Sequence, residues 1–119
     1  MAKILVVDDS AFAQRTMRRI LESAGHLVVA AEDGITGLEK TFLEKPDLIV
    51  LDLTMPDMHG LDVLAKLREL DPGVRVIIAT ADIQASSKLM SEEAGALGFI
   101  TKPYEPGAVL SVVSSALAE

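Results

Sequence analysis

Short runs of hydrophobic residues alternate along the chain with longer segments in which hydrophobic and polar positions are mixed. The five runs cover residues 4–7, 27–30, 48–51, 74–79 and 97–100. They are rich in β-branched residues and do not alternate with polar residues. This pattern is typical of strands that are buried on both faces, as in a parallel sheet. The sequence therefore predicts five parallel strands with a helical segment after each.

The segments between the runs carry helical signals. In the first, Ala13, Met17 and Leu21 recur at helical spacing, Ser10 is a favourable N-cap, and Gly25 stands where a helix would end. Similar signals predict a second helix over residues 34–44, a third marked by Leu61, Leu64, Ala65 and Leu67, a fourth capped by Asp82 and running to about Ala94, and a fifth from Pro106 almost to the end of the chain.

Five strand–helix units within 119 residues predict one domain that spans residues 1–119. The expected fold class is α/β, a five-stranded parallel doubly wound sheet of the flavodoxin-like type with helices on both faces. The strand order expected for this form is 2-1-3-4-5, which places the switch point between the first and third strands. A ligand is therefore expected at the carboxyl ends of those two strands.

Composition narrows the class of function. Hydrophobic residues make up 50% of the chain and charged residues 24%, which is typical of a folded globular domain. The net charge of −7 argues against binding to nucleic acid or to acidic membranes. The absence of cysteine excludes thiol chemistry and thiolate metal sites, and two histidines cannot form a three-histidine site. No segment has the length of a membrane span or the pattern of a secretory signal, so we expect a cytoplasmic protein.

Acidic residues follow two of the predicted strands. Asp8 and Asp9 come directly after the first strand, and Asp52 follows the third. Three carboxylates in one crevice repel one another, and a hard cation such as Mg²⁺ (or Mn²⁺) removes that repulsion. Capping of the following helices is the alternative role for these acids. After the last two strands, Thr80 offers a hydroxyl beside the small Ala81, and Lys102 offers a cation that can reach a phosphoryl oxygen or a carboxylate.

Four motifs, in this order, resemble those of the CheY-like receiver domain of two-component response regulators. They read VDDS (residues 7–10), LDLTMPDMHG (51–60), TA (80–81) and TKPY (101–104). The resemblance covers essentially the whole chain. It implies a signalling phosphoacceptor, not an enzyme beyond its own Mg²⁺-dependent phosphorylation and slow dephosphorylation.

The resemblance also implies roles for individual residues. Asp52 would accept a phosphoryl group from a histidine kinase or a histidine phosphotransfer protein. The metal ligands would be Asp8, Asp9, Asp52 and the backbone carbonyl of Thr54, and the phosphoryl oxygens would be bound by Thr80, Ala81 and Lys102. Thr80 and the aromatic Phe99 would form the switch, and the family suggests a cis peptide bond between Lys102 and Pro103.

Four positions depart from the common family pattern or vary within it. His59 stands where Asn or Asp is usual before the glycine, and we interpret it as a surface loop residue. Phe99 lacks the hydroxyl of the commoner tyrosine. Thr54 and Asp82 are at positions that tune dephosphorylation in the family.

The last helix predicts an interaction surface. Residues 107–118 contain no charged side chain, and Leu110 and Leu117 lie at the edge of the stripe that packs on the sheet. With Ile83, Leu89 and Phe99 they would form an apolar docking face for a downstream target protein or an output domain, or for a second copy of the chain upon phosphorylation. The family uses this face for output. The alternative is that the two leucines belong to the margin of the core.

Two other classes of protein share parts of this pattern. A flavodoxin-type electron carrier needs a loop rich in Ser, Thr and Gly after the first strand, whereas this chain has two acids there. A haloacid-dehalogenase-like phosphatase resembles D-x-D, whereas the second acid is replaced here by Thr54. Both classes therefore fit this sequence less well than the receiver domain does.

Overall fold

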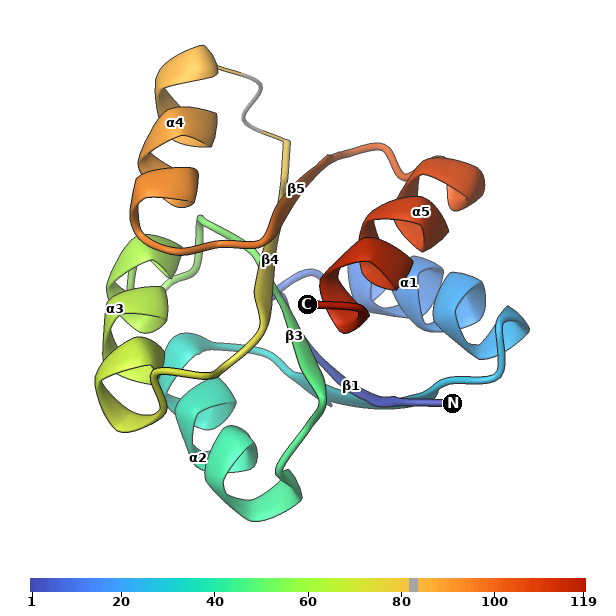
Figure 1. The fold of residues 1–119 in the computed structure, drawn as a ribbon, viewed down its shortest axis with the longest axis horizontal. Helices are drawn as coiled ribbons and strands as arrows, with labels where there is room; N and C mark the ends of the chain where they lie inside the picture. Colours follow the sequence, from blue (N-terminus) through green and yellow to red (C-terminus); the bar gives the residue numbers. More distant parts are fainter. Residues whose placement is uncertain (82–83) are drawn as a thin grey trace.

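The computed structural model describes residues 1–81 and 84–119, which form alternating strands and helices (Figure 1). The strands are β1 (Lys3–Val7), β2 (Leu27–Ala31), β3 (Leu48–Leu51), β4 (Val76–Thr80) and β5 (Gly98–Thr101). The helices are α1 (Ala11–Ser23), α2 (Gly34–Glu44), α3 (Gly60–Leu70), α4 (Ala85–Glu93) and α5 (Pro106–Leu117). The predicted α/β alternation is confirmed.

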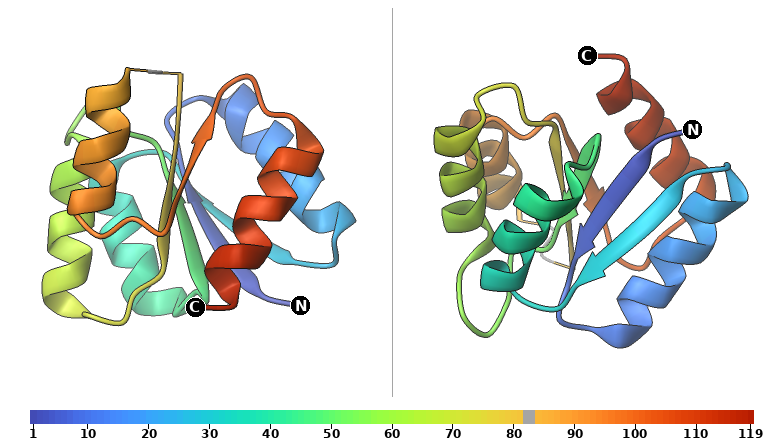
Figure 2. Two further views of the ribbon diagram at one scale, coloured as in Figure 1. Left: turned by 45° about the horizontal axis from the view of Figure 1, so that its top comes forward. Right: turned by 90° about the horizontal axis from the view of Figure 1, so that it is seen from below.

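The strands form one parallel sheet in the order β2-β1-β3-β4-β5, as the sequence predicted. In the register of β1 and β3, Val7 is the partner of Leu51. Both strands end at these residues, so the loops that follow them leave the same edge of the sheet side by side. Helices α1 and α3 then turn to opposite faces, which opens the switch point between them (Figure 2).

Two hydrophobic clusters hold the helices against the sheet. Helices α1 and α5 cover one face, and α2, α3 and α4 cover the other (Figure 2). Because successive side chains of a strand point to opposite faces, Ile4 packs in the first cluster and Leu5 in the second. Both side chains are fully buried, which explains why the strand sequences show no alternation with polar residues.

The sequence located the last two strands only approximately. Strand β4 begins at Val76, because the N–H of Val74 donates to the carbonyl of Asp71 at 3.0 Å and closes a turn. Strands β4 and β5 extend to Thr80 and Thr101. The predicted third helix is present as α3, in which Ala65 is exposed and Val63 is fully buried beside Leu64 and Leu67.

Helix ends follow local signals. The hydroxyl oxygen of Ser10 accepts a hydrogen bond from the N–H of Ala13 at 3.1 Å, and Gly25 follows α1 with a φ of +87°. Helix α2 ends at Lys45, which adopts a φ of +48° before Pro46. The proposed cap of α4, Asp82, lies outside the described residues, within which Gln84 is the N-cap. None of the described helices has the length and hydropathy needed to cross a membrane.

Candidate functional site

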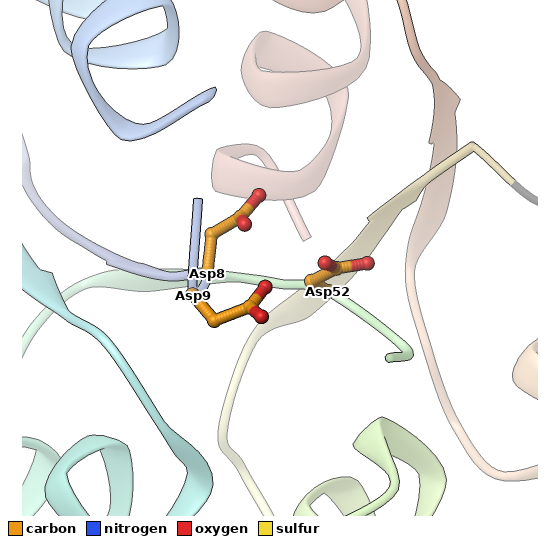
Figure 3. Close-up of side chains that lie close together, drawn as sticks. All are labelled: Asp8, Asp9 and Asp52. Atoms are coloured by element: carbon orange, nitrogen blue, oxygen red, sulfur yellow. The ribbon is translucent and has the colours of Figure 1, made fainter. Parts of the chain in front are cut away.

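Three acidic side chains meet at the carboxyl edge of the sheet (Figure 3). Asp8, Asp9 and Asp52 each offer a carboxylate oxygen, and these oxygens all lie within 4.8 Å of one another. Asp8 and Asp52 are buried, whereas Asp9 is exposed. Carboxylate oxygens from a partly open site are the donors that Mg²⁺ prefers, because the ion keeps several of its waters. The donor set therefore fits a hard divalent cation.

A lysine reaches the same carboxylates from the end of β5. The Nζ atom of Lys102 lies 2.8 Å from Oδ2 of Asp8 and 3.4 Å from Oδ2 of Asp52. The backbone N–H of Lys102 donates to the carbonyl of Thr80 at 2.9 Å, and its peptide bond to Pro103 is cis, as the resemblance implied. The lysine is therefore held at both its backbone and its side chain.

The environment shifts the ionisation of these groups. Burial raises the pKa of the Asp52 carboxyl; the charge of Asp8 acts in the same direction and the Lys102 ammonium opposes it. Burial alone would lower the pKa of Lys102, but the hydrogen bond and charge of Asp8, together with Asp52, raise it above its usual range. Burial and the two carboxylates also raise the pKa of the Tyr104 hydroxyl. The cluster is thus a partly buried anionic site in which Lys102 is held in its charged form.

Two groups orient the loop that carries the first two acids. The N–H of Ser10 donates to Oδ1 of Asp8 at 2.9 Å. The side-chain amide of Gln14 donates to the backbone carbonyls of Asp8, at 2.6 Å, and Ala31, at 3.2 Å. Gln14 therefore fastens the loop after β1 to the end of β2. Nothing local in the sequence marks Gln14, because its second partner belongs to another strand.

The loop between β3 and α3 passes directly beside Asp52. A Cβ atom at Gly60 would lie 2.6 Å from the Cα of Leu53, so only glycine fits this close approach. The N–H of Gly60 donates to the carbonyl of Leu53 at 2.7 Å. His59 is exposed, as expected, but it has a structural role that the sequence did not reveal: its Nδ1 accepts from the N–H of Leu61 at 3.1 Å and caps α3.

The same loop is tied to the neighbouring helix by Asp57. Its carboxylate accepts hydrogen bonds from the N–H groups of Gly34, at 2.9 Å, and Ile35, at 3.0 Å, at the N-terminus of α2. These hydrogen bonds lower the pKa of Asp57. Sequence analysis missed this contact because its partners are far from Asp57 in the chain, and no spacing rule connects them.

The two residues predicted after β4 differ in exposure, and one of them lines a pocket. Thr80 is buried at the end of β4, and Ala81 is exposed. An open pocket of about 540 Å³ adjoins Lys102. Its lining residues come from α1 and from the segments after β4 and β5, namely Ser10, Phe12, Ala13, Thr16, Ala81, Lys102, Pro103 and Tyr104. The pocket therefore reaches the lysine that contacts the carboxylates, but the three acids are not among its lining residues.

The residues expected to form a docking face lie on different sides of the sheet. Phe99 is half-buried against the cluster beneath α2, α3 and α4, whereas Leu110 and Leu117 are half-buried against the cluster beneath α1 and α5. Leu89 on α4 is 56% exposed. Ile83 lies outside the described residues.

Comparisons with known proteins point to one family and one fold. The family model of the response regulator receiver domain matches residues 4–114. The chain is 38% identical over 116 residues to chemotaxis protein CheY of Bacillus subtilis, covering 97% of each chain. It is 34% identical over 113 residues to CheY of Thermotoga maritima, covering 94% of each. A solved structure of the CheX–CheY–BeF3–Mg complex from Borrelia burgdorferi matches with a TM-score of 0.94 and 32% identity, covering 98% of this chain and 90% of that chain.

Proposed function

The chain belongs to the receiver domain family of response regulators, and on this premise we propose that Asp52 is its phosphoacceptor. The observation that carries the proposal is the position of Asp52. Its carboxylate lies at the switch point of the sheet, buried, with oxygens of Asp8 and Asp9 within 4.8 Å and the Lys102 ammonium at 3.4 Å. Such a carboxylate can act as a nucleophile when it is ionised, and the Lys102 ammonium favours the ionised form against burial and the charge of Asp8, which raise the pKa of Asp52.

The transfer step is a displacement at phosphorus. A carboxylate oxygen of Asp52 forms a new P–O bond while the bond from phosphorus to the donor breaks, and the donor leaves with the bonding electron pair. With a phosphohistidine donor the bond that breaks is P–N. With a small acyl phosphate it is P–O. The product is an aspartyl phosphate on Asp52.

Charge on the transferring group is the main obstacle, since the site already holds three acids. Asp8, Asp9, Asp52 and the backbone carbonyl of Thr54 would hold Mg²⁺, which supplies positive charge to the phosphoryl oxygens. The ammonium of Lys102 would supply a second positive charge. Because Lys102 already contacts Asp52 at 3.4 Å, a short side-chain movement suffices to reach a phosphoryl oxygen.

Readout of phosphorylation would begin at Thr80. The residue ends β4 next to Ala81, and its neighbour in the pairing of β4 and β5 is Thr101. A phosphoryl group on Asp52 would draw the Thr80 hydroxyl toward it, and Phe99 would turn inward into the space released. The surface formed by α4, β5 and α5 would change shape as a result.

A histidine kinase or histidine phosphotransfer protein is the proposed phosphodonor. Lys102, which contacts Asp52, also lines an open pocket of about 540 Å³ beside which such a donor could dock. The proposed acceptors of the signal are a target protein or an output domain on the α4–β5–α5 surface. The solved relative in complex with CheX supports the view that a protein partner is part of this function.

The test is Mg²⁺-dependent labelling by acetyl phosphate, followed by intact-mass measurement. The wild-type chain should gain one phosphoryl group, and Asp52→Asn should gain none. Asp57→Asn is the matched control, because it removes a carboxylate from the same loop and should leave labelling intact. Labelling of Asp52→Asn, or labelling that EDTA does not reduce, would overturn the assignment.

A further inference from the structure

Helix α2 exposes large apolar side chains on the face of the molecule that the phosphoacceptor chemistry does not use. Phe42 and Leu43 are 74% and 77% exposed, and Leu70, at the end of the neighbouring α3, is 65% exposed. Single exposed apolar residues are ordinary, but grouped ones mark contact surfaces. Phe42 and Leu70 line two adjoining pockets at this surface, and Leu43 lines one of the two.

Helix α2 packs on the sheet without Phe42 and Leu43, through two glycines and the half-buried Leu38. The inward positions of the helix include Gly34 and Gly37, both buried. A Cβ atom at Gly37 would lie 3.0 Å from the methyl groups of Val7, so the helix approaches β1 closely through a small residue. Phe42 and Leu43 are exposed and belong to neither core cluster, so they lie outside this helix–sheet contact.

A groove of about 360 Å³ runs between the C-terminal parts of α2 and α3. The main side chains of its two walls are Leu38, Phe42 and Lys45 from the α2 side, and Leu67, Leu70 and Asp71 from the α3 side. Both helices lead back from the carboxyl edge of the parallel sheet, so they run in the same direction and end side by side (Figure 1). Each wall thus offers an exposed apolar side chain followed by a charged one.

The two charges have opposite sign. Lys45 and Asp71 are both exposed, and neither forms an ion pair within residues 1–81 and 84–119. Among the described residues, the carboxylate of Asp71 accepts a single, local hydrogen bond, from the N–H of Gly73 at 3.0 Å. In a dimer whose two-fold axis runs parallel to the groove, the α2 wall of one copy would face the α3 wall of the other. Residues at the same height along the groove would then lie opposite each other. Lys45 would then face Asp71 of the second copy, and Phe42 would face its Leu70.

We propose that the α2–α3 groove is a contact surface for a second copy of this chain. The surface complements itself in charge and in apolar character, which is the requirement for a two-fold interface. It lies at the C-terminal ends of the two helices, away from the carboxyl edge of the sheet that holds Asp52. Association through it is therefore independent of phosphorylation, in contrast to a dimer formed by the α4–β5–α5 surface.

Sedimentation velocity of the full chain tests this proposal over a wide concentration series. Salt of about 0.15 M screens the repulsion between two chains of net charge −7. We expect a reversible monomer–dimer equilibrium that is the same for wild type and for Asp52→Asn. Phe42→Ser should raise the dissociation constant at least about tenfold. Phe12→Ser is the matched control, since Phe12 is 72% exposed on α1, and it should leave the constant unchanged.

A charge-reversal experiment tests the two-fold arrangement itself. The Lys45→Glu variant alone and the Asp71→Lys variant alone should each be monomeric. In a dimer of either variant, positions 45 and 71 of the two copies would carry the same charge at both contacts. An equimolar mixture of the two variants should associate, because every contact in the mixed dimer is again a pair of opposite charges. A wild-type chain that stays monomeric throughout, or a dimer unaffected by Phe42→Ser and by the single reversals, would overturn the proposal and leave the groove to another protein.

Discussion

The Nζ atom of Lys102 lies 2.8 Å from Oδ2 of Asp8, and this ion pair links the end of β5 to the end of β1 across the candidate site. Asp8 is 2% exposed, so its carboxylate depends on this partner for compensation of its charge. The same carboxylate belongs to the acidic cluster that fits a divalent cation. Lys102 and a bound divalent cation would therefore both neutralise the negative charge of the Asp8 carboxylate.

Replacing Lys102 by Met should have two opposite effects. Stability without divalent ions should fall by about 2 kcal/mol, because a buried carboxylate loses its partner. Mg²⁺ should bind several-fold more tightly, because a competing cation is gone. Urea unfolding in EDTA measures the stability, and the thermal shift as a function of Mg²⁺ concentration measures the affinity for Mg²⁺. Lys66→Met, at an exposed position of α3, is the control and should change neither. Weaker Mg²⁺ binding in Lys102→Met would show that the lysine orders the site instead of competing there.

The three acids should not contribute equally to stability. Asp9 is exposed and has no ion pair among residues 1–81 and 84–119, so Asp9→Asn should stabilise the chain in EDTA by about 1 kcal/mol through relief of repulsion. Asp8→Asn should destabilise it, because Lys102 loses its nearer partner. Chemical unfolding of both variants decides this. Equal effects of the two substitutions would mean that the ion pair with Lys102 has no energetic weight.

The lowered pKa of Asp57 predicts how its contribution to the stability of the fold depends on pH. Its pKa is lowered by the N–H groups of Gly34 and Ile35, so its stabilising effect is fully present above the ordinary value of 3.8 and is lost as pH falls through the lower pKa of the folded state. Asp57→Ala should therefore be less stable than wild type at neutral pH, and the difference should shrink below that value. Unfolding curves across this pH range measure it. Glu69→Ala, at an exposed position of α3, should show a much smaller difference at every pH.

Gly60 should tolerate no side chain. Gly60→Ala would force a methyl group to 2.6 Å from the Cα of Leu53, against backbone that cannot move without displacing Asp52. We expect a loss of about 3 kcal/mol or more and a lower affinity for Mg²⁺. Gly73→Ala is the control, because its nearest neighbour is the Asp71 carboxylate at 3.5 Å. Wild-type stability in Gly60→Ala would show that the loop beside Asp52 is free to shift.

The apolar residues on α4 and α5 should respond differently to a charge. Leu110 is half-buried against the core beneath α5, so Leu110→Glu should cost about 2 kcal/mol. Leu89 is 56% exposed, and Leu89→Glu should change stability by less than about 0.5 kcal/mol. Thermal unfolding separates the two. If Leu110→Glu is fully stable, Leu110 is surface and can take part in docking as the sequence suggested.

Much of the architecture was accessible from local sequence. Uninterrupted runs such as residues 48–51 could be assigned to buried parallel strands, because strands covered on both faces need no polar side. Ser10 and Gly25 marked the ends of α1 by their own conformational preferences. The strand order and its switch point followed from the number and type of units, and they placed Asp8 and Asp52 at one edge of the sheet.

Tertiary structure alone decided the contacts whose partners are distant in sequence. No pattern indicated that Lys102 would contact Asp8 more closely than Asp52, that Asp57 would cap α2, or that Gln14 would bridge β1 and β2. Leu110 could be placed only at the edge of its helical stripe, because its burial depends on the neighbouring helix and not on α5. Local sequence determined which groups this protein brings to the edge of its sheet, since periodicity and chain direction are local properties. Which atoms then meet was decided by the packing of separate segments, because a contact energy depends on positions that no single segment specifies.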